Sequence, residues 1–410
     1  LTLTSVMGLV ACGNNNASNG TKETVDWASV EKPGHFTIMV DGTVPTLEEW
    51  GEKFDEQLKS LTGLDFEVTR PDHNSYYDAV ANSMLDASAM PDVIILSSDY
   101  LALYASQGLL WDMTDAWNNS ATKSSGRLIS DAEKIMKANY VRGVDGEKSL
   151  YGFVPARGNG CVTYVKEAWA TQAGYSKADL TSKQLSYDEF YTMLKKMKEA
   201  RGVDYVISAP GFYSKEAPYT NYLPEFYQNA QLTFYYDQAK GEYVDGFSQK
   251  EMKDALQRIQ NAVKDGVIDK ATLGQKTTDA RNKFFSTDAS SESGVFSYWA
   301  GTWANTLMTN LKSKGLPTDL IAINPIKELG TYVERIAPAW CITTSAKNPE
   351  GIFKYFIDTM LDGGDIQTAW TYGAKGTHWN DKAETVTLAD NKGTFEYKEG
   401  EFHFLPSPEK

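Results

Sequence analysis

The residues Pro91–Leu96, PDVIIL, constrain the fold more than any other feature of the chain. They are apolar at consecutive positions, which is typical of a strand buried on both faces of a parallel sheet. Two further strands are expected upstream, at 35–40 and 65–69. Apolar residues spaced by three and four predict helices between the strands, over 46–62 and 75–87. This alternation predicts βαβ units, a parallel sheet and an α/β class of fold.

The remainder of the chain continues in the same style. Short apolar runs predict strands at 162–165, 205–209, 294–299 and 320–323. Capping residues that precede an apolar helical pattern predict helices beginning at Ser186, Ser248 and Asn348. Glycine and proline gather near 151–160, and a second break falls near 337–344. These two segments are candidate crossings between two α/β lobes.

The composition excludes several classes of function. The 40 Lys and Arg stand against 54 Asp and Glu, so the formal charge is −14, whereas a nucleic-acid binder needs a basic face. The 4 His and 3 Cys show no metal-ligand spacing, and no P-loop, GxGxxG, GxSxG, HExxH or CxxC motif occurs. No run of 18 apolar residues is present to span a membrane. We therefore expect no nucleic-acid partner, metal, cofactor or catalytic residue.

The N-terminal segment has the pattern of an exported lipoprotein. Residues 1–11 are apolar or small and uncharged, as in the core of a signal peptide. The following LVACG resembles the bacterial lipobox, in which Cys12 receives the lipid; the alternative is a buried cysteine in an apolar segment. Residues 13–26 are expected to form a flexible tether. The folded body would then lie outside the cytoplasmic membrane, held to it by lipid.

Several blocks, in order, resemble one protein family. They are Met90–Asp115 (MPDVIILSSDYLALYASQGLLWDMTD), Tyr151–Gly158 (YGFVPARG), Val162–Lys166 (VTYVK), Gly294–Trp303 (GVFSYWAGTW), Asn348–Glu350 (NPE) and Tyr372–Trp379 (YGAKGTHW). Each block is short, but together with the lipobox they resemble the family 1 extracellular solute-binding proteins, in their LplA-like branch. These are the receptor lipoproteins of ABC sugar importers. In the last block Lys375 replaces the acid of the family pattern and Trp379 replaces its tyrosine.

The resemblance implies a two-lobed periplasmic-binding-protein-like fold of type II, with hinge crossovers between the lobes. Lobe 1 is expected to hold 27–155 and 342–380, and lobe 2 to hold 156–341 and 381–410. The implied function is to bind a carbohydrate, an oligosaccharide by preference, in the interlobe cleft and deliver it to the transmembrane subunits of an ABC permease. Family members continue beyond the last block, and no basic segment precedes residue 1, so both ends are expected to be incomplete.

The candidate ligand-binding residues are polar groups at strand ends and aromatic rings near crossovers. Ligands of open α/β sheets bind beyond the carboxyl ends of the strands, and sugars need aromatic plates with planar hydrogen-bonding groups. By the resemblance, the aromatic positions face the interlobe cleft. The candidates are Asp41, Thr43, Tyr77, Ser98, Asp99, Arg157, Tyr298, Trp299, Trp303, Trp340 and Tyr372.

Other interpretations remain open at this point. Each aromatic candidate can equally be a packing residue, Trp299 in particular, and Asp41 can simply shape a turn. A surface glycoside hydrolase or lyase would need paired carboxylates across a cleft. A receptor of the same fold for a peptide or another polar solute would have a cleft rich in charge. Cys161 and Cys341 lie at the two crossings, and we expect buried thiols there because a disulfide would lock a hinge that must move.

Overall fold

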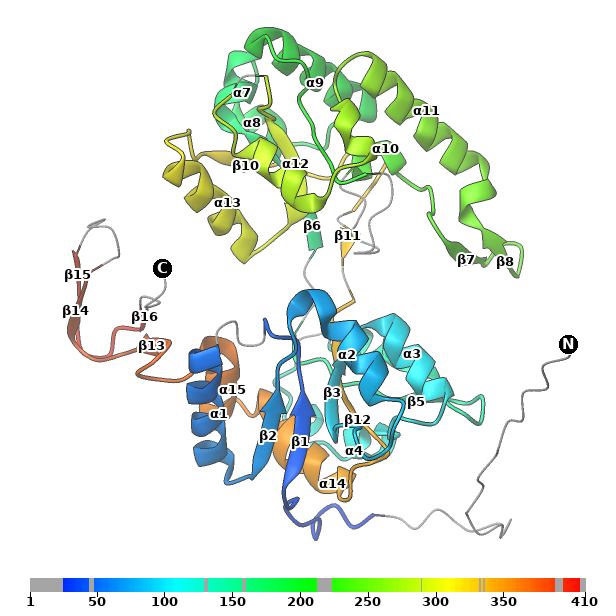
Figure 1. Cartoon of the computed structure of the whole chain (residues 1–410), viewed down its shortest axis with the longest axis vertical. Helices are drawn as coiled ribbons and strands as arrows, with labels where there is room; N and C mark the ends of the chain where they lie inside the picture. The colour runs from blue at the N-terminus through cyan, green and yellow to red at the C-terminus, as the bar shows by residue number, and fades with distance from the viewer. Residues whose placement is uncertain are drawn as a thin grey trace, which may run out of the picture. The chain divides into compact units, whose positions relative to one another are not determined.

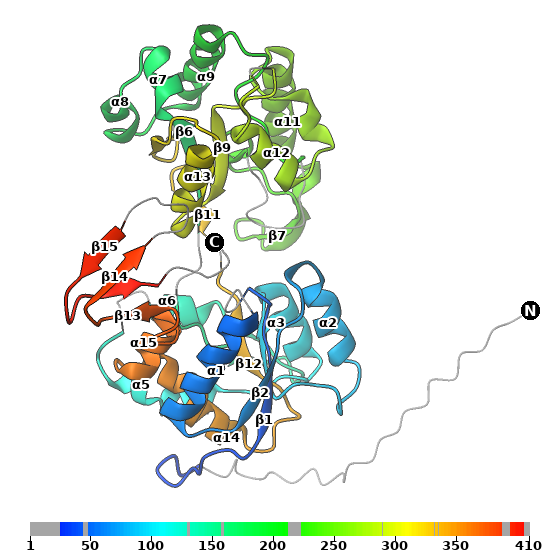
Figure 2. The same cartoon turned by 60° about the vertical axis from the view of Figure 1, so that its left-hand side comes forward.

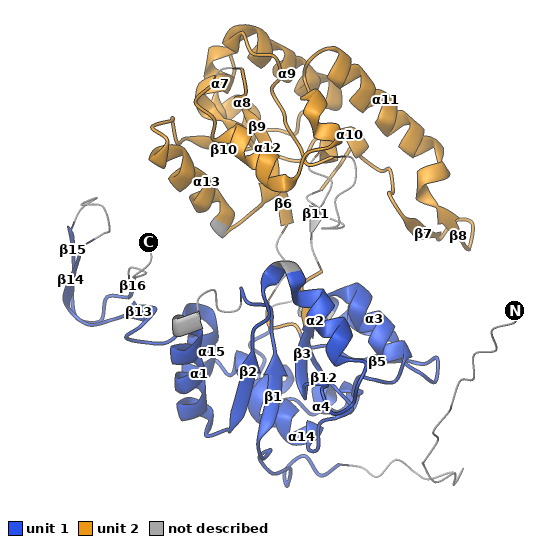
Figure 3. Cartoon of the chain, viewed as in Figure 1, with its two compact units in different colours: residues 1–153, 340–410 blue, residues 154–339 orange. Residues whose placement is uncertain are grey.

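The computed structural model describes residues 25–43, 48–128, 132–156, 160–211, 223–288, 290–331, 333–334, 336–387 and 394–405. The chain divides into two compact units (Figure 3): unit 1 holds residues 1–153 and 340–410, and unit 2 holds residues 154–339. The division expected from the sequence falls two residues later at each crossing. Residues 381–410, expected in the second lobe, group with unit 1 instead. The reason is local pairing of β13 (Trp379–Asn380) with β16 (His403–Phe404).

The sheet of unit 1 has the order β12-β3-β1-β2, formed by Ala339–Ile342, Val93–Leu96, Phe36–Met39 and Phe66–Thr69. The strand β1 runs parallel to both β2 and β3, as the βαβ pattern predicted. All four residues of β3 are buried, in agreement with its unbroken apolar run. The Asp92 carboxylate accepts hydrogen bonds from the Thr37 backbone N–H at 2.7 Å and hydroxyl at 3.0 Å, and so ties β1 to the start of β3.

Helices flank this sheet. The helix α1 (Glu48–Thr62) is followed by Gly63, whose φ of +65° suits glycine. This helix lies beside α15 (Asp365–Tyr372), next to β2 (Figures 1 and 2). The helices α2 (Tyr76–Ser83) and α3 (Ser98–Ser106) follow β2 and β3. The helix predicted from Asn348 is present as α14 (Pro349–Ile352), η4 (Phe353–Ile357) and η5 (Asp358–Leu361). The remaining elements are η1 (His73–Ser75), α4 (Thr114–Asn118), α5 (Ala121–Ser124), α6 (Ala132–Lys137), β4 (Tyr140–Arg142), β5 (Lys148–Leu150), β14 (Glu384–Thr387) and β15 (Thr394–Tyr397).

Unit 2 is built on an antiparallel sheet. The strand β6 (Gly160–Lys166) pairs antiparallel with β9 (Val295–Trp299), β10 (Leu320–Ala322) and β11 (Val333–Glu334). The longest helices are α9 (Tyr187–Arg201), α11 (Lys250–Lys264) and α13 (Thr302–Ser313). The other elements are α7 (Glu167–Gln172), α8 (Lys177–Thr181), α10 (Pro224–Tyr227), β7 (Phe234–Asp237), β8 (Glu242–Asp245), η2 (Gly246–Ser248), η3 (Lys270–Leu273) and α12 (Thr277–Phe284).

Local predictions in unit 2 have mixed outcomes. Ser186 caps α9 in a capping box with Glu189, as predicted. The prediction that Ser248 caps the next helix is wrong, because its hydroxyl donates to the Asp245 carbonyl at 2.9 Å and α11 begins at Lys250. The strand predicted at 205–209 contributes only isolated bridges from Ile207 to Ile268 and Val295.

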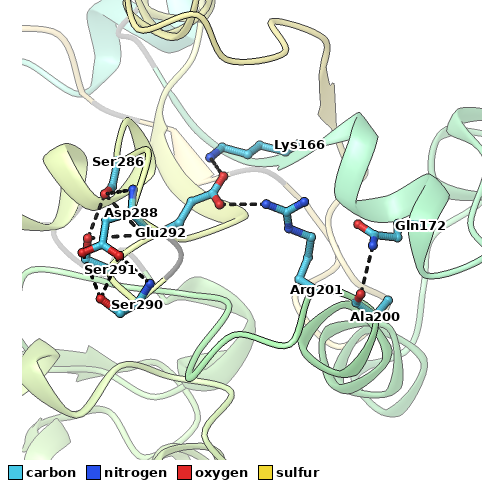
Figure 4. A network of polar contacts seen from close by, with 9 residues as sticks. All are labelled: Lys166, Gln172, Ala200, Arg201, Ser286, Asp288, Ser290, Ser291 and Glu292. Carbon is cyan, nitrogen blue, oxygen red and sulfur yellow. Dashed lines mark hydrogen bonds and ion pairs between the residues drawn. The ribbon is translucent and has the colours of Figure 1, made fainter.

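A buried ion network holds three segments of unit 2 together (Figure 4). The Glu292 carboxylate contacts Lys166 Nζ at 3.0 Å and Arg201 Nη2 at 2.9 Å, one with each oxygen. The side chains of Lys166 and Glu292 are only 5% and 6% exposed. Burial lowers the pKa of Lys166, and the contact with Glu292 opposes that shift. The network therefore ties the end of β6 to the last turn of α9.

The two cysteines at the crossings are buried thiols, Cys161 in unit 2 and Cys341 in unit 1. Burial raises the pKa of Cys341 well above its ordinary value. Among the residues that the structure describes, none of the helices is both long and apolar enough to cross a bilayer.

Candidate functional site

Asp41 is the centre of a polar turn beyond the end of β1. Its Oδ1 accepts hydrogen bonds from the Thr43 backbone N–H at 2.8 Å and hydroxyl at 2.7 Å, and its Oδ2 lies 2.7 Å from His73 Nδ1. Burial opposes ionisation of the carboxyl, but the hydrogen bonds from Thr43 and the contact with His73 outweigh it, so the pKa of Asp41 is lowered. Asp41 therefore shapes its own turn and presents an exposed Thr43 and His73 to solvent.

Two tyrosines in succession have different surroundings beyond the end of β3. Tyr76 is buried, and its hydroxyl donates to the carbonyls of Ile95 at 2.7 Å and Met39 at 3.3 Å. Tyr77 is half-buried, and its hydroxyl accepts the backbone N–H of Ser97 at 3.0 Å. The ring of Tyr77 stacks on that of Tyr100 with centroids 4.5 Å apart and planes 10° apart. A paired aromatic plate thus lies at the start of α3, with Ser98 half-buried and Asp99 exposed beside it in sequence.

The Asp41 turn and the tyrosine pair belong to the same edge of one sheet. Tyr76 bridges the carboxyl ends of β1 and β3, because its hydroxyl contacts a carbonyl of each strand. Asp41 follows β1 and Ser97 follows β3, and these strands are parallel neighbours. This edge is where ligands bind in open α/β sheets. Tyr100 was missed in the sequence, although its position directly after Ser98 and Asp99 was a usable signal.

A second group lies in unit 2 at the end of β9. Tyr298 is 5% exposed and meets the half-buried Trp303 edge to face, with centroids 4.7 Å apart and planes at 88°. Arg281, on α12, donates from Nη1 to the Tyr298 hydroxyl at 3.2 Å. Its guanidinium carbon is 5.4 Å from the centroid of the Trp303 ring and 5.8 Å from that of Tyr298. Arg281 had no signal in the sequence, because the contact joins a helix to a strand further along the chain.

The side chain of Trp299 lies on the opposite face of β9 from that of Tyr298. Successive side chains of a strand point to opposite faces, so Trp299 is separated from the pair that Tyr298 forms with Trp303. The Trp299 ring is half-buried against the core of unit 2, and its carbonyl accepts the Tyr164 hydroxyl at 2.8 Å.

Trp340 packs in the core of unit 1, whereas the expected lobe division placed it in lobe 2. It is 6% exposed and meets Trp370 and Phe356 edge to face, at centroid distances of 5.2 Å and 5.9 Å. These rings line a cavity of about 10 Å³, bordered by the ion pair of Arg70 with Asp55. Such a cavity has room for about one water molecule and not for a sugar.

The other candidates lie apart from these groups or outside the described residues. Tyr372 is 41% exposed and packs on rings of the C-terminal segment, with Phe402 at a centroid distance of 4.7 Å. Arg157 and Cys12 lie outside the described residues.

The chemistry of the two groups is that of binding. Hydroxyls, a carboxylate and a guanidinium lie beside aromatic rings, and these are the groups that hold a polar ligand with apolar faces. Among the described residues, no group of three or more His, Cys, Asp or Glu could hold a metal ion.

Comparisons with known proteins agree with this architecture. The sequence matches the family described as bacterial extracellular solute-binding protein over residues 44–362. No curated protein matches it. The fold is similar to a family 1 extracellular solute-binding protein from Alicyclobacillus acidocaldarius, with a TM-score of 0.53 and 17% identity over 83% of this chain and 76% of that chain.

Two further solved structures of similar fold are those of sugar-binding proteins. The maltose-bound MalE3 of T. maritima gives a TM-score of 0.58 and 17% identity, covering 83% of this chain and 80% of that chain. An HMO-binding, ABC-transporter-associated solute-binding protein from Bifidobacterium longum infantis gives a TM-score of 0.57 and 13% identity, covering 86% of this chain and 72% of that chain. Identities this low show a common fold alone. They confirm the predicted α/β, two-lobed periplasmic-binding-protein-like class.

Proposed function

The chain belongs to the family of bacterial extracellular solute-binding proteins, and on that premise we propose that it binds a carbohydrate, an oligosaccharide by preference, for delivery to an ABC permease. One observation carries the proposal: each unit holds an aromatic plate with polar groups at its edge. In unit 1 this is Tyr77 with Tyr100, and in unit 2 it is Trp303 with Tyr298 and Arg281. The maltose-bound and HMO-binding proteins of the same fold support the ligand class.

The proposed chemistry follows from the shape of a sugar. A pyranose has two faces of C–H bonds, which pack on aromatic rings, and a rim of hydroxyls, which hydrogen-bond to planar polar groups. Stacking places the ring on Tyr100 or Trp303. The Thr43 hydroxyl in unit 1 and the Arg281 guanidinium in unit 2 then hydrogen-bond to hydroxyls of the sugar. No bond of the sugar is broken, because the proposed role needs only reversible binding.

Transport requires the bound state to differ from the empty one. A ligand that contacts residues of both units stabilises the conformation in which both contacts are made, by its difference in affinity for the two states. We propose this hinge closure as the signal that the permease recognises. Attachment of lipid at Cys12 would keep the receptor at the extracellular face of the membrane, next to the permease.

Titration of tryptophan fluorescence against mono- and oligosaccharides tests the proposal. Saturable binding of one saccharide class is expected, and Trp303→Ala should weaken it about fivefold or more, because a stacked ring contributes on the order of 1 kcal/mol or more. The matched control is Tyr243→Ala, which removes a 76% exposed ring on β8 that belongs to neither group. Equal affinities for the two variants would overturn the assignment of Trp303, and absence of binding to every saccharide would overturn the proposed ligand class.

A further inference from the structure

Among the described residues, Arg281 differs in its partners from three other arginines, Arg70, Arg201 and Arg258. Arg70 pairs with Asp55, with Nη2 and Oδ1 2.6 Å apart, and Arg201 pairs with Glu292 at 2.9 Å. Arg258 donates from Nε to the Phe226 carbonyl at 2.7 Å. Within the described ranges, Arg281 pairs with no carboxylate, and its hydrogen-bond partner is the neutral hydroxyl of Tyr298. An arginine has five N–H donors, so among the described residues most of this guanidinium is without a protein acceptor.

The surroundings of Arg281 fix its position without neutralising its charge. The guanidinium lies over Trp303 at 5.4 Å and beside Tyr298, so the aromatic rings and one hydrogen bond hold it in place. The nearest acid along its helix is Asp279, whose Oδ2 accepts the Lys276 backbone N–H at 2.9 Å and so caps the first turn. The other nearby cation, Lys283, is paired with the buried Asp269. Arg281 is therefore the oriented positive charge of this group.

The Arg281 guanidinium is held in one orientation, pairs with no carboxylate of the described residues, and lies beside an aromatic ring that could stack on a sugar. This arrangement indicates an anionic ligand. The chain carries a formal charge of −14, which disfavours anions in general, so retention of an anionic sugar requires a local cation. A guanidinium matches a planar carboxylate or a sulfate with two parallel N–H donors. Trp303 supplies the apolar surface next to that contact for the ring that carries the anion.

We propose that the group of Arg281, Trp303 and Tyr298 is a subsite for an acidic sugar unit, a uronate carboxylate or a sulfate ester. The inference rests on the proposed carbohydrate-binding function and narrows its ligand class. Trp303 holds the ring, Arg281 receives the anionic substituent, and Tyr298 orients the guanidinium through its hydroxyl. Tyr298 and Trp303 are positioning and stacking residues respectively, and Arg281 carries the discrimination between acidic and neutral sugars.

The test compares matched ligands on the unmodified full chain by isothermal titration calorimetry. The probes are oligogalacturonides, the same oligomers with their carboxyls methyl-esterified, neutral malto-oligosaccharides, and a sulfated disaccharide with its unsulfated counterpart. An acidic form is expected to bind on the order of tenfold to a hundredfold more tightly than its neutral partner. Its affinity should also fall as salt is raised, because the contact is between charges. Comparison of the oligogalacturonides with their methyl esters tests for a carboxylate, and comparison of the sulfated with the unsulfated disaccharide tests for a sulfate ester.

Variants then assign the discrimination to a residue. Arg281→Gln should bring the acidic and neutral forms to about equal affinity, and Arg281→Lys should retain part of the preference. The matched control is Arg258→Gln, which removes another arginine of unit 2, one whose guanidinium carbon lies 5.8 Å from the centroid of a tyrosine ring. This variant should keep the preference for the acidic form. The far-ultraviolet circular dichroism and melting temperature of each variant check its folding. The ligand pairs on the unmodified chain test the proposal even if a variant is unstable.

The outcomes separate this inference from the function on which it rests. Tight binding of neutral oligosaccharides with no preference for either acidic form would overturn the acidic subsite and leave the carbohydrate receptor standing. A preference for acidic sugars that survives in Arg281→Gln would overturn the assignment of the subsite to Arg281. Absence of binding to all the saccharides, acidic and neutral, would overturn both.

Discussion

Replacement of Glu292 by leucine should be among the most destabilising single changes in unit 2. Glu292 is the shared acid of the buried network, and its loss leaves Lys166 with a side chain only 5% exposed and no carboxylate partner (Figure 4). Removing one member of a buried ion pair costs about 3–5 kcal/mol, because the remaining charge is neither hydrated nor compensated. Arg201 is 34% exposed and can be hydrated, so the penalty falls mainly on Lys166. We therefore expect about 3 kcal/mol, at the lower end of that range.

The measurement is thermal unfolding followed by circular dichroism. For a unit of this size, 1 kcal/mol shifts the melting temperature by roughly 2–4 °C, so Glu292→Leu should lower that of unit 2 by about 6–12 °C. The double variant Lys166→Met with Glu292→Leu should recover most of the loss, because no buried charge then remains without a partner. As a control, Asp254→Asn breaks the exposed pair with Lys250 and should change the melting temperature little, because solvent screens an exposed ion pair. A shift for Glu292→Leu no larger than for Asp254→Asn would refute the reasoning, as would a double variant less stable than the single one.

Three further outcomes are expected. The hydrogen bond with Glu384 raises the pKa of His403. The stability that this pair contributes is therefore present below the unfolded pKa of about 6.5 and is lost as the pH rises through the folded pKa. His403→Gln should flatten this part of the melting-temperature profile between pH 5 and 8, and an unchanged profile would contradict the pairing. Leu58→Ala should cost about 2–5 kcal/mol in chemical unfolding because the side chain is 1% exposed and already borders a cavity; a loss under about 1 kcal/mol would show that the neighbouring rings collapse into the space. Tyr100→Ala should weaken saccharide binding several-fold, whereas Tyr236→Ala, on an exposed hairpin, should leave it unchanged; equal affinities would remove the tyrosine pair of unit 1 from the site.

The predictable parts of this fold are those whose signal is contained in a few consecutive residues. The unbroken apolar run of β3 is sufficient to indicate a strand buried on both faces, and the Ser186–Glu189 spacing is sufficient to fix the start of α9. The error at Ser248 has the same local character. Two capping arrangements competed over a few residues, and the hydrogen bond of the Ser248 hydroxyl to the Asp245 carbonyl prevailed in the structure.

The unpredictable parts depend on contacts between distant segments. The antiparallel arrangement of β6 with β9 joins residues more than a hundred positions apart, and neither strand carries a mark of its partner. Trp303 was a reasonable candidate because it lies just past a strand end, but only the fold shows that Arg281 is placed over its ring. Trp340 shows the limit of the same argument: it also lies at a crossing, yet its neighbours Phe356 and Trp370 make it a core residue.

Native mass spectrometry of the full chain with a mixed panel of neutral and acidic oligosaccharides tests whether this chain is a carbohydrate receptor. We expect a one-to-one complex with one saccharide class, and recovery of that saccharide with its mass unchanged. A complex with no member of the panel, or release of shortened saccharides, would contradict it.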